Sequence, residues 1–151
     1  MNKKNFRDNN NKILLDTSFL LPILGFETSN RIMRAFQKLG SYELYYSDIS
    51  ILEALWKIVK VIKGTREELS RISEGISAIR ETMKYAPIDE KVVENAIYMF
   101  KLGHKDMIDN LLYSIAMTKK LRLLTVDKDL VEFIKKHDLD KDSVILPEEL
   151  E

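Results

Sequence analysis

The chain has 151 residues, of which 45 % are hydrophobic and 32 % are charged, and this composition is typical of a globular protein rather than a disordered one. Without cysteine it can form neither a disulfide framework nor a thiolate zinc site, and no apolar run approaches the roughly 20 residues of a membrane-spanning helix. Its 24 basic residues equal its 24 acidic residues, so there is no overall positive charge to drive non-specific binding of nucleic acid.

Residues 1–11 are rich in Asn and show no periodicity, so we expect a flexible tail followed by one domain over residues 12–151. The same segment lacks the apolar stretch of a signal peptide, and we therefore expect a cytoplasmic location. The short apolar run over residues 12–16 predicts a buried parallel strand. A short helix is predicted over 19–25, a second helix over 29–39, and a second strand over 43–47.

The rest of the chain continues this alternation of strands and helices. The patterns predict helices from 48 to about 62 and over 66–84, 89–102, 106–119 and 128–136, and strands over 122–126 and 144–146. Residues 85–88 contain a proline and predict a connector or an edge strand. Strands that alternate with helices favour an α/β sandwich whose sheet is mostly parallel and has about five strands.

Two of these helices carry more apolar surface than one small sheet is expected to cover. The helix over 48–62 has a wide apolar stripe, made of Leu52, Leu55, Trp56, Val59 and Ile62. The helix over 66–84 has a narrower one, made of Leu69, Ile72, Ile76, Ile79 and Met83. These surfaces predict a homodimer with a two-fold interface. The alternative is that the two helices pack against each other within one chain.

Four acidic residues occur where this architecture would bring side chains together. Asp16 and Asp127 each follow an apolar strand, Asp109 lies in the first turn of a helix, and Glu53 lies in the helix after the second strand. The carboxyl ends of parallel strands form one edge of the sheet, where ligands collect. Carboxylates that converge there repel one another, and a hard cation such as Mg²⁺ or Mn²⁺ relieves the repulsion. The pattern therefore predicts a metal site for phosphate chemistry.

Each acid also has a purely structural interpretation. Asp16 and Asp127 could cap the helices that follow them, and Asp109 could interact with a helix dipole. Glu53 could form an ordinary ion pair with Lys57 one helical turn later. These interpretations stay open at the level of the individual residue.

Other chemistry has little support in the sequence. There is no Ser-His-Asp set and no glycine-rich phosphate-binding loop. His104 and His137 are isolated and share no ligand spacing, so we expect both at the surface.

Taken in order, the four acidic segments resemble the four motifs of PIN domains, and the resemblance spans roughly residues 12–147. The matching segments are Lys-Ile-Leu-Leu-Asp16-Thr17-Ser18, Tyr-Tyr-Ser-Asp-Ile-Ser-Ile-Leu-Glu53, Asp109-Asn-Leu-Leu-Tyr-Ser-Ile-Ala116, and Thr125-Val-Asp127-Lys-Asp129. Two positions depart from the family pattern, because Val126 stands where Arg is frequent and Leu130 where Phe is frequent. These departures bear on substrate contacts rather than on the acids.

The resemblance implies a three-layer α/β/α fold and a ribonuclease dependent on Mg²⁺ or Mn²⁺, often the VapC-type toxin of a toxin–antitoxin pair. It implies RNA as the substrate, a small antitoxin protein as a possible partner, and hydrolysis by a metal-activated water. The implied catalytic acids are Asp16, Glu53, Asp109 and Asp127, of which Asp16, Asp109 and Asp127 hold the one or two cations. The implied supporting residues, which orient the ligands or the substrate, are Thr17, Thr125 and Asp129.

Three alternatives to this interpretation need residue patterns or behaviour that differ from it. A phosphoacceptor receiver domain needs paired acids at the end of the first strand, where this chain has Asp16 and Thr17. A haloacid-dehalogenase-type phosphatase needs Asp-x-Asp there, and Ser18 occupies the second position. The third is a PIN-like RNA-binding or scaffold protein with a weak metal site. Cleavage of RNA by the protein that stops when a chelator is added would exclude this third alternative.

Overall fold

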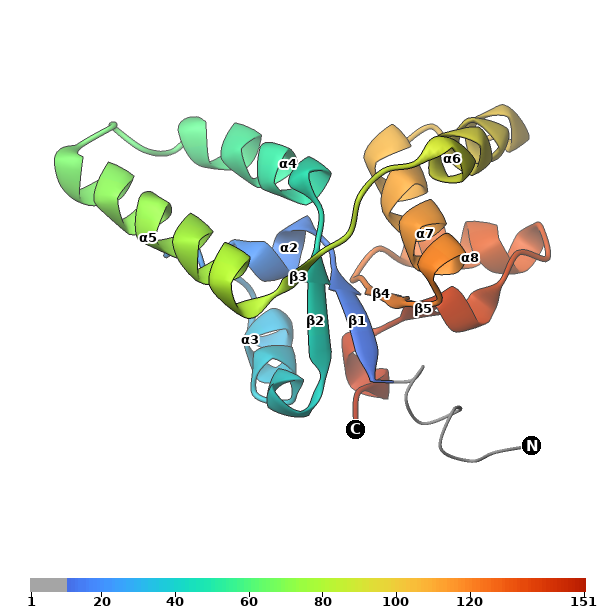
Figure 1. Cartoon of the computed structure of the whole chain (residues 1–151), viewed down its shortest axis with the longest axis horizontal. Coiled ribbons are helices and arrows are strands. Elements are labelled where there is room, and N and C mark those ends of the chain that lie inside the picture. Colours follow the sequence, from blue (N-terminus) through green and yellow to red (C-terminus); the bar gives the residue numbers. More distant parts are fainter. Residues whose placement is uncertain (1–10) are drawn as a thin grey trace.

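The computed structural model describes residues 11–151 and contains one five-stranded sheet with helices on both faces (Figure 1). The strands are β1 (Lys12–Leu15), β2 (Glu43–Tyr46), β3 (Lys84–Tyr85), β4 (Arg122–Leu124) and β5 (Val144–Ile145). Their order is β3-β2-β1-β4-β5, and every neighbouring pair is parallel. The predicted α/β/α sandwich with a parallel sheet is confirmed. Residues 1–10, most of the predicted flexible tail, lie outside the described part.

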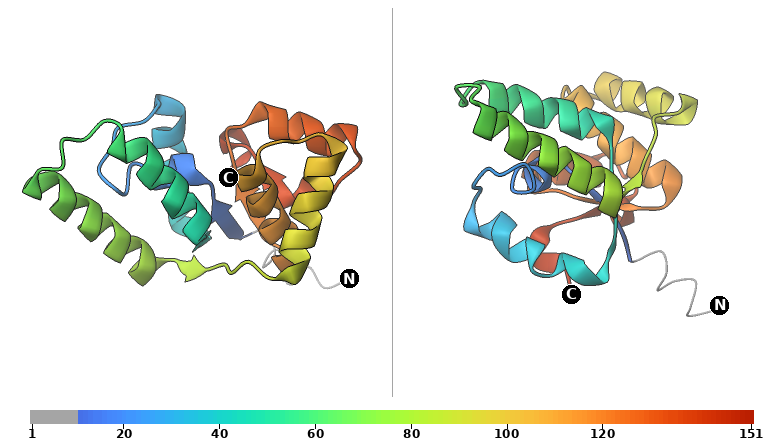
Figure 2. Two further views of the ribbon diagram at one scale, coloured as in Figure 1. Left: turned by 90° about the horizontal axis from the view of Figure 1, so that it is seen from above. Right: turned by 60° about the vertical axis from the view of Figure 1, so that its left-hand side comes forward.

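Two helical layers cover the sheet. The α-helices of the described residues are α2 (Thr17–Leu20), α3 (Asn30–Phe36), α4 (Asp48–Val59), α5 (Arg66–Thr82), α6 (Glu90–Leu102), α7 (Met107–Lys119) and α8 (Lys128–Lys136). Helices α2, α3, α4 and α5 lie on one side of the sheet and α6, α7 and α8 on the other, as the views of Figure 2 show. No helix in residues 11–151 combines the length and the apolar character needed to cross a membrane.

The central strand β1 is buried on both faces. Its side chains alternate, so Ile13 and Leu15 belong to the core under α2–α5, whereas Leu14 belongs to the core under α6–α8. In β4 the neighbours Leu123 and Leu124 divide between the two cores in the same way. This is why the strands read as continuous apolar runs, the pattern of a parallel sheet covered on both sides.

Helix and strand boundaries differ from the predicted ones by a few residues, and capping explains several of the differences. Helix α2 begins at Thr17, not Phe19, because the Asp16 carboxylate accepts a hydrogen bond of 2.9 Å from the Ser18 N–H. Helix α4 is capped by Ser47 rather than Asp48 and ends at Val59. Residues 84–85 form the edge strand β3, so the edge-strand alternative for this segment is correct up to its exact position.

The chain itself covers the apolar stripes of α4 and α5 to different extents. In α4 the buried residues are Ser50, Ala54 and Ile58, whereas Leu52, Trp56 and Val59 are 47 %, 54 % and 62 % exposed. The helix therefore turns its smaller residues to the core, because α2 packs closely against it.

Helix α5 uses most of its stripe within the chain. Ile79 is buried, and Ile72, Ile76 and Met83 pack on the core under α2–α5, whereas Leu69 is exposed. Gly75 lets the helix approach the segment after α2, because a Cβ atom there would lie 2.6 Å from the carbonyl oxygen of Ile23.

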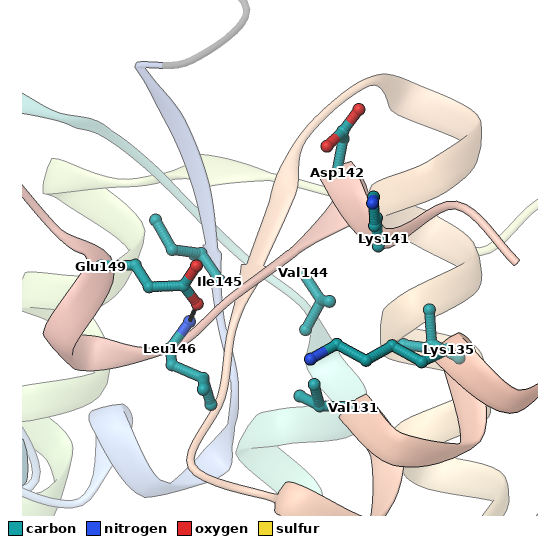
Figure 3. Close-up of a pocket in the computed structure, with 9 residues that line it drawn as sticks. Val131, Lys135, Lys141, Asp142, Val144, Ile145, Leu146 and Glu149 are labelled. Carbon is teal, nitrogen blue, oxygen red and sulfur yellow. Dashed lines mark hydrogen bonds between the residues drawn. The ribbon is translucent and has the colours of Figure 1, made fainter.

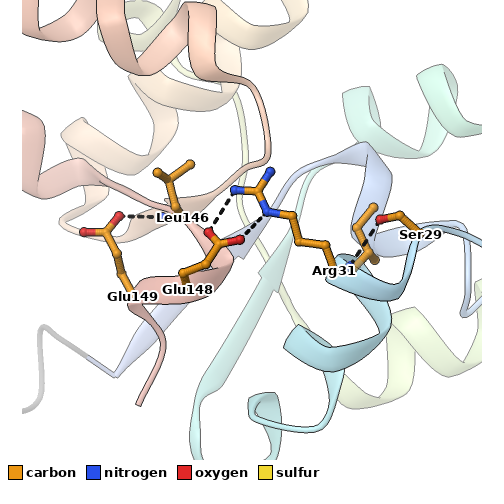
Figure 4. Close-up of polar contacts among 6 residues, drawn as sticks. Ser29, Arg31, Leu146, Glu148 and Glu149 are labelled. Atoms are coloured by element: carbon orange, nitrogen blue, oxygen red, sulfur yellow. Dashed lines mark hydrogen bonds and ion pairs between the residues drawn. The ribbon is translucent and has the colours of Figure 1, made fainter.

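The C-terminal segment returns to the side of α3 (Figure 4). Arg31 of α3 forms a two-pronged ion pair with Glu148, and the Glu149 carboxylate accepts a hydrogen bond of 2.9 Å from the Leu146 N–H. Leu150 is buried in the core under α2–α5. These contacts hold the C-terminal segment against α3 and the core under α2–α5.

Candidate metal centre

The strand order creates a crevice at the carboxyl ends of β1 and β4. The chain leaves β1 toward β2 and β3 on one side, whereas β4 and β5 pair on the other. Connections that diverge in this way leave an opening above the two central strands, where ligands bind in α/β proteins. The Asp16 N–H still donates to the carbonyl of Leu124 at 3.2 Å, so the residues that follow β1 and β4 emerge side by side.

Asp16 lies at the floor of this crevice and is buried. Its carboxylate accepts hydrogen bonds from the Ser18 N–H and from the Thr125 hydroxyl, which in turn accepts from the Asp127 N–H at 3.0 Å. Burial nevertheless raises the pKa of Asp16 to about 6, with a smaller contribution from the negative charge of Glu53. The position therefore disfavours the carboxylate form unless positive charge is supplied.

Asp109 and Asp127 face each other across the same opening. Asp109 is in the first turn of α7, where its N–H donates to the Asp106 cap at 3.1 Å, and Asp127 caps α8. Burial raises the pKa of Asp109 well above its usual value, and the hydrogen bond to Asp127 and the nearby acids raise it further. The same hydrogen bond lowers the pKa of Asp127. The two carboxyl groups are therefore close enough to interact directly, and they repel each other when both are ionised.

Asp16, Asp109 and Asp127 line one pocket of about 170 Å³. Among the predicted site residues, the structure brings Asp16, Thr17, Glu53, Asp109 and Asp127 to its walls. It is also lined by Ser18, Lys57, Asp106 and Val126.

The two remaining predicted residues do not line this pocket. Thr125 is buried behind Asp16 and holds it through the hydrogen bond described above. Asp129 is exposed, and only its backbone contacts the site, by donating to the Asp127 carboxylate at 2.9 Å.

Thr17 contributes an unusual feature. Its hydroxyl is buried and finds no hydrogen-bond partner among the described residues, although the residue lines the carboxylate pocket. Buried polar groups are almost always hydrogen-bonded, so an unpaired hydroxyl beside a pocket is compatible with a water, a ligand or an ion there.

His104, which we expected at the surface, is half-buried beside the acids. One ring nitrogen of His104 and one oxygen each of Asp109 and Asp127 lie within 4.8 Å of one another. His137 is also half-buried, and both imidazole rings pack on Phe133. The expectation for both histidines was wrong. His104 packs on a residue of the distant helix α8, a contact that spacing along the sequence does not reveal, whereas His137 packs on Phe133 one turn earlier at the end of the same helix.

A larger hollow of about 380 Å³ lies elsewhere, between α8 and β5 (Figure 3). Val131, Val144 and Leu146 give it an apolar wall, and Lys135, Lys141, Asp142 and Glu149 stand around it with mixed charge. It has no converging carboxylates, so the chemistry of the molecule is concentrated in the smaller pocket.

A family model of the PIN domain matches residues 13–136, a stretch that includes all four acidic segments. The chain belongs to the PIN domain family. None of the curated proteins matches the chain in sequence.

Solved structures with a similar fold include a toxin–antitoxin complex, a FitAB–DNA complex and a toxin. A toxin–antitoxin complex from Klebsiella pneumoniae has 17 % identity and a TM-score of 0.64, and covers 89 % of this chain and 97 % of its own. FitAB bound to a DNA fragment has 20 % identity and a TM-score of 0.68, covering 92 % and 97 %. VapC20 from Mycobacterium tuberculosis, described as a sarcin–ricin loop cleaving toxin, has 18 % identity and a TM-score of 0.59, covering 85 % and 97 %. At these identities the likeness establishes the fold.

The donor set of this PIN domain fits a divalent cation. Carboxylate oxygens from separate elements line one small pocket, and an unpaired hydroxyl lies beside them. Burial and mutual repulsion raise the pKa values of Asp16 and Asp109, and a cation would reverse both effects. The residues therefore suit a hard metal ion, with Lys57 as the one basic side chain among the described residues that lines the pocket.

Proposed function

We propose that this PIN domain is an endoribonuclease that depends on Mg²⁺ or Mn²⁺ and acts as the toxin of a toxin–antitoxin pair. The observation that carries the proposal is the pocket itself, where four acids from β1, α4, α7 and the end of β4 converge although they are far apart in sequence. The burial of Asp16 and the mutual repulsion of the acids are unfavourable in the absence of a ligand, and a bound cation would relieve both.

Asp16, Asp109 and Asp127 are proposed to hold the cation, and Glu53 to act directly or through a water. When bound, the cation lowers the pKa of a water and stabilises negative charge on a phosphodiester. Thr125 orients Asp16 through its hydroxyl, and the unpaired hydroxyl of Thr17 is available to the cation or to the substrate. Asp109 must release its proton before it can serve as a ligand, so binding of the cation should be accompanied by proton release.

Lys57 is proposed to position the substrate. It lies one helical turn after Glu53 on α4, lines the pocket, and its charge lowers the pKa of Asp16. An ammonium group beside a carboxylate cluster offers a counter-charge to one phosphate of the RNA, since phosphate contacts position a nucleic acid without reading its sequence.

The proposed partners are RNA, a small antitoxin protein and a second copy of the chain. The antitoxin is suggested by the toxin–antitoxin complexes that share the fold. The second copy is suggested by Leu52, Trp56 and Val59, which form an exposed apolar face along α4 at helical spacing. A cytoplasmic location and the organisation of residues 12–151 as one domain stay predictions.

Cleavage of a structured RNA, followed on a denaturing gel with Mg²⁺, Mn²⁺ or excess EDTA, tests the proposal. We expect metal-dependent cleavage by the wild-type protein, loss of at least 100-fold in Asp16→Asn, and a smaller loss in Lys57→Met. Asp138→Asn is the matched control, because Asp138 is exposed and lies outside the pocket. RNA that is bound but never cleaved would favour the scaffold alternative, and cleavage that persists in EDTA would contradict the proposal.

A further inference from the structure

We propose that His104 gives the carboxylate centre a nitrogen ligand, so that this site prefers a divalent transition ion, Co²⁺ or Mn²⁺, over Mg²⁺. The inference rests on the proposed metal site and goes beyond it by naming an additional ligand and the class of cation that follows from it.

The first support is position. His104 lies in the loop between α6 and α7, and its ring nitrogen is grouped with oxygens of Asp109 and Asp127, all within 4.8 Å of one another. A cation with bonds of about 2.0–2.2 Å holds ligand atoms up to roughly 4.4 Å apart, so a small closing movement is enough to bring the three onto one ion. The two carboxylates also line the pocket of Asp16, so the imidazole extends that site rather than forming a separate one.

The second support is the tautomer of His104. The amide of Asn110 is fully buried, and its NH₂ group donates to the backbone carbonyls of His104 at 2.8 Å and Ala96 at 3.4 Å. Its remaining atom, Oδ1, is an acceptor and lies 2.6 Å from Nδ1 of His104. Nδ1 must therefore carry the proton, which leaves the lone pair of the neutral ring on Nε2.

A histidine whose second nitrogen donates to a buried oxygen is the usual arrangement of a metal-binding imidazole. The ring of His104 is further held by Phe133, whose centroid lies 5.0 Å away. The orientation is thus imposed by two neighbours before any ion arrives. The adjoining pocket, which Asp109 and Asp127 also line, holds the buried and unpaired hydroxyl of Thr17.

The choice of cation follows from ligand chemistry. Mg²⁺ binds oxygen almost exclusively, keeps several of its waters and requires near-ideal octahedral geometry. Imidazole nitrogen is a good ligand for first-row transition ions, which bind mixed nitrogen and oxygen sets more tightly. An imidazole beside the acids therefore raises the affinity for Co²⁺ most, raises that for Mn²⁺ less, and leaves that for Mg²⁺ nearly unchanged.

The chain provides a matched control for the experiment. His137 is its only other histidine and also packs on Phe133, with a centroid distance of 4.3 Å, but it is outside the group formed by His104 with the acids. Isothermal titration calorimetry with Co²⁺, Mn²⁺ and Mg²⁺ would compare the wild-type protein with His104→Ala and His137→Ala. We expect His104→Ala to lose at least tenfold in affinity for Co²⁺, a smaller factor for Mn²⁺ and less than twofold for Mg²⁺. We expect His137→Ala to behave as the wild type.

The outcomes separate this inference from the proposed function. If the wild-type protein binds none of the three ions, the metal site itself is wrong. If it binds them and His104→Ala keeps the wild-type ratio of transition-ion to Mg²⁺ affinity, only the role of His104 is wrong. Should His104→Ala not fold, ¹⁵N spectra of the two imidazoles of the wild-type protein decide the question. Zn²⁺, used as a diamagnetic probe, should shift Nε2 of His104 but not that of His137, and two unshifted rings would overturn the inference.

Discussion

Replacing Asp16 by Asn should make the metal-free protein more stable while it abolishes the proposed activity. The variant keeps nearly the same shape. Asn is as good a helix cap as Asp, so the bond from the Ser18 N–H is retained, and the side-chain carbonyl can still accept from the Thr125 hydroxyl. What changes is the charge, which is buried near Glu53 and Asp109.

The magnitude follows from the pKa of Asp16. Burial raises it from 3.8 to about 6, and each pKa unit corresponds to 1.36 kcal/mol, so the cost of the buried charge is roughly 3 kcal/mol. Because the folded protein holds the proton more tightly than the unfolded chain, the cost is absent below pH 3.8, grows between pH 3.8 and 6, and is complete above pH 6. Asp16→Asn should therefore match the wild type near pH 4 and exceed it by up to about 3 kcal/mol at pH 7–8.

Urea unfolding in EDTA, at pH values from 4 to 8, measures this difference, with Asp138→Asn as the control. A gain of 3 kcal/mol raises the melting temperature of a protein of this size by about 6–12 °C. Mn²⁺ at 1,000 times its Kd should reverse the order, since a ligand at that concentration stabilises the wild type by about 4.1 kcal/mol. A gain that is equal at pH 4 and pH 8, or a loss at every pH, would refute the reasoning.

Two further predictions concern packing and assembly. Gly75→Ala should destabilise the protein by about 1–3 kcal/mol despite the better helix propensity of Ala, because the new methyl group meets the backbone of Ile23 and Leu24. Urea unfolding measures this loss. Gly40→Ala is the control and should be close to neutral, because no atom lies within 4 Å of its Cβ position. Trp56→Glu should convert the proposed dimer into a folded monomer in sedimentation, whereas Met33→Glu, at another exposed apolar residue, should leave the dimer intact. A wild-type protein that is monomeric at high concentration would exclude the dimer.

The sequence by itself determined the order of elements and the acids at the strand ends. Short apolar runs such as Ile13–Leu15 identify strands buried on both faces, and an acid directly after such a run must lie at the sheet edge, because a carboxylate in the core would be too costly. These patterns are local, with caps and stop signals that act over a few residues. For that reason the parallel sheet and the position of Asp16 could be predicted from them.

Only the tertiary structure decided which faces and which distant side chains meet. The stripe of α4 is apolar enough to suggest burial, yet the close approach of α2 turns Ala54 and Ile58 inward and leaves Trp56 exposed. His104 carries no signal of its own in the sequence. Its place beside Asp127 depends on a buried amide at position 110 and on the packing of α8 against a loop that precedes it by more than twenty residues. Such contacts depend on how several helices and strands are placed relative to one another, and a pattern within a few residues does not determine that placement.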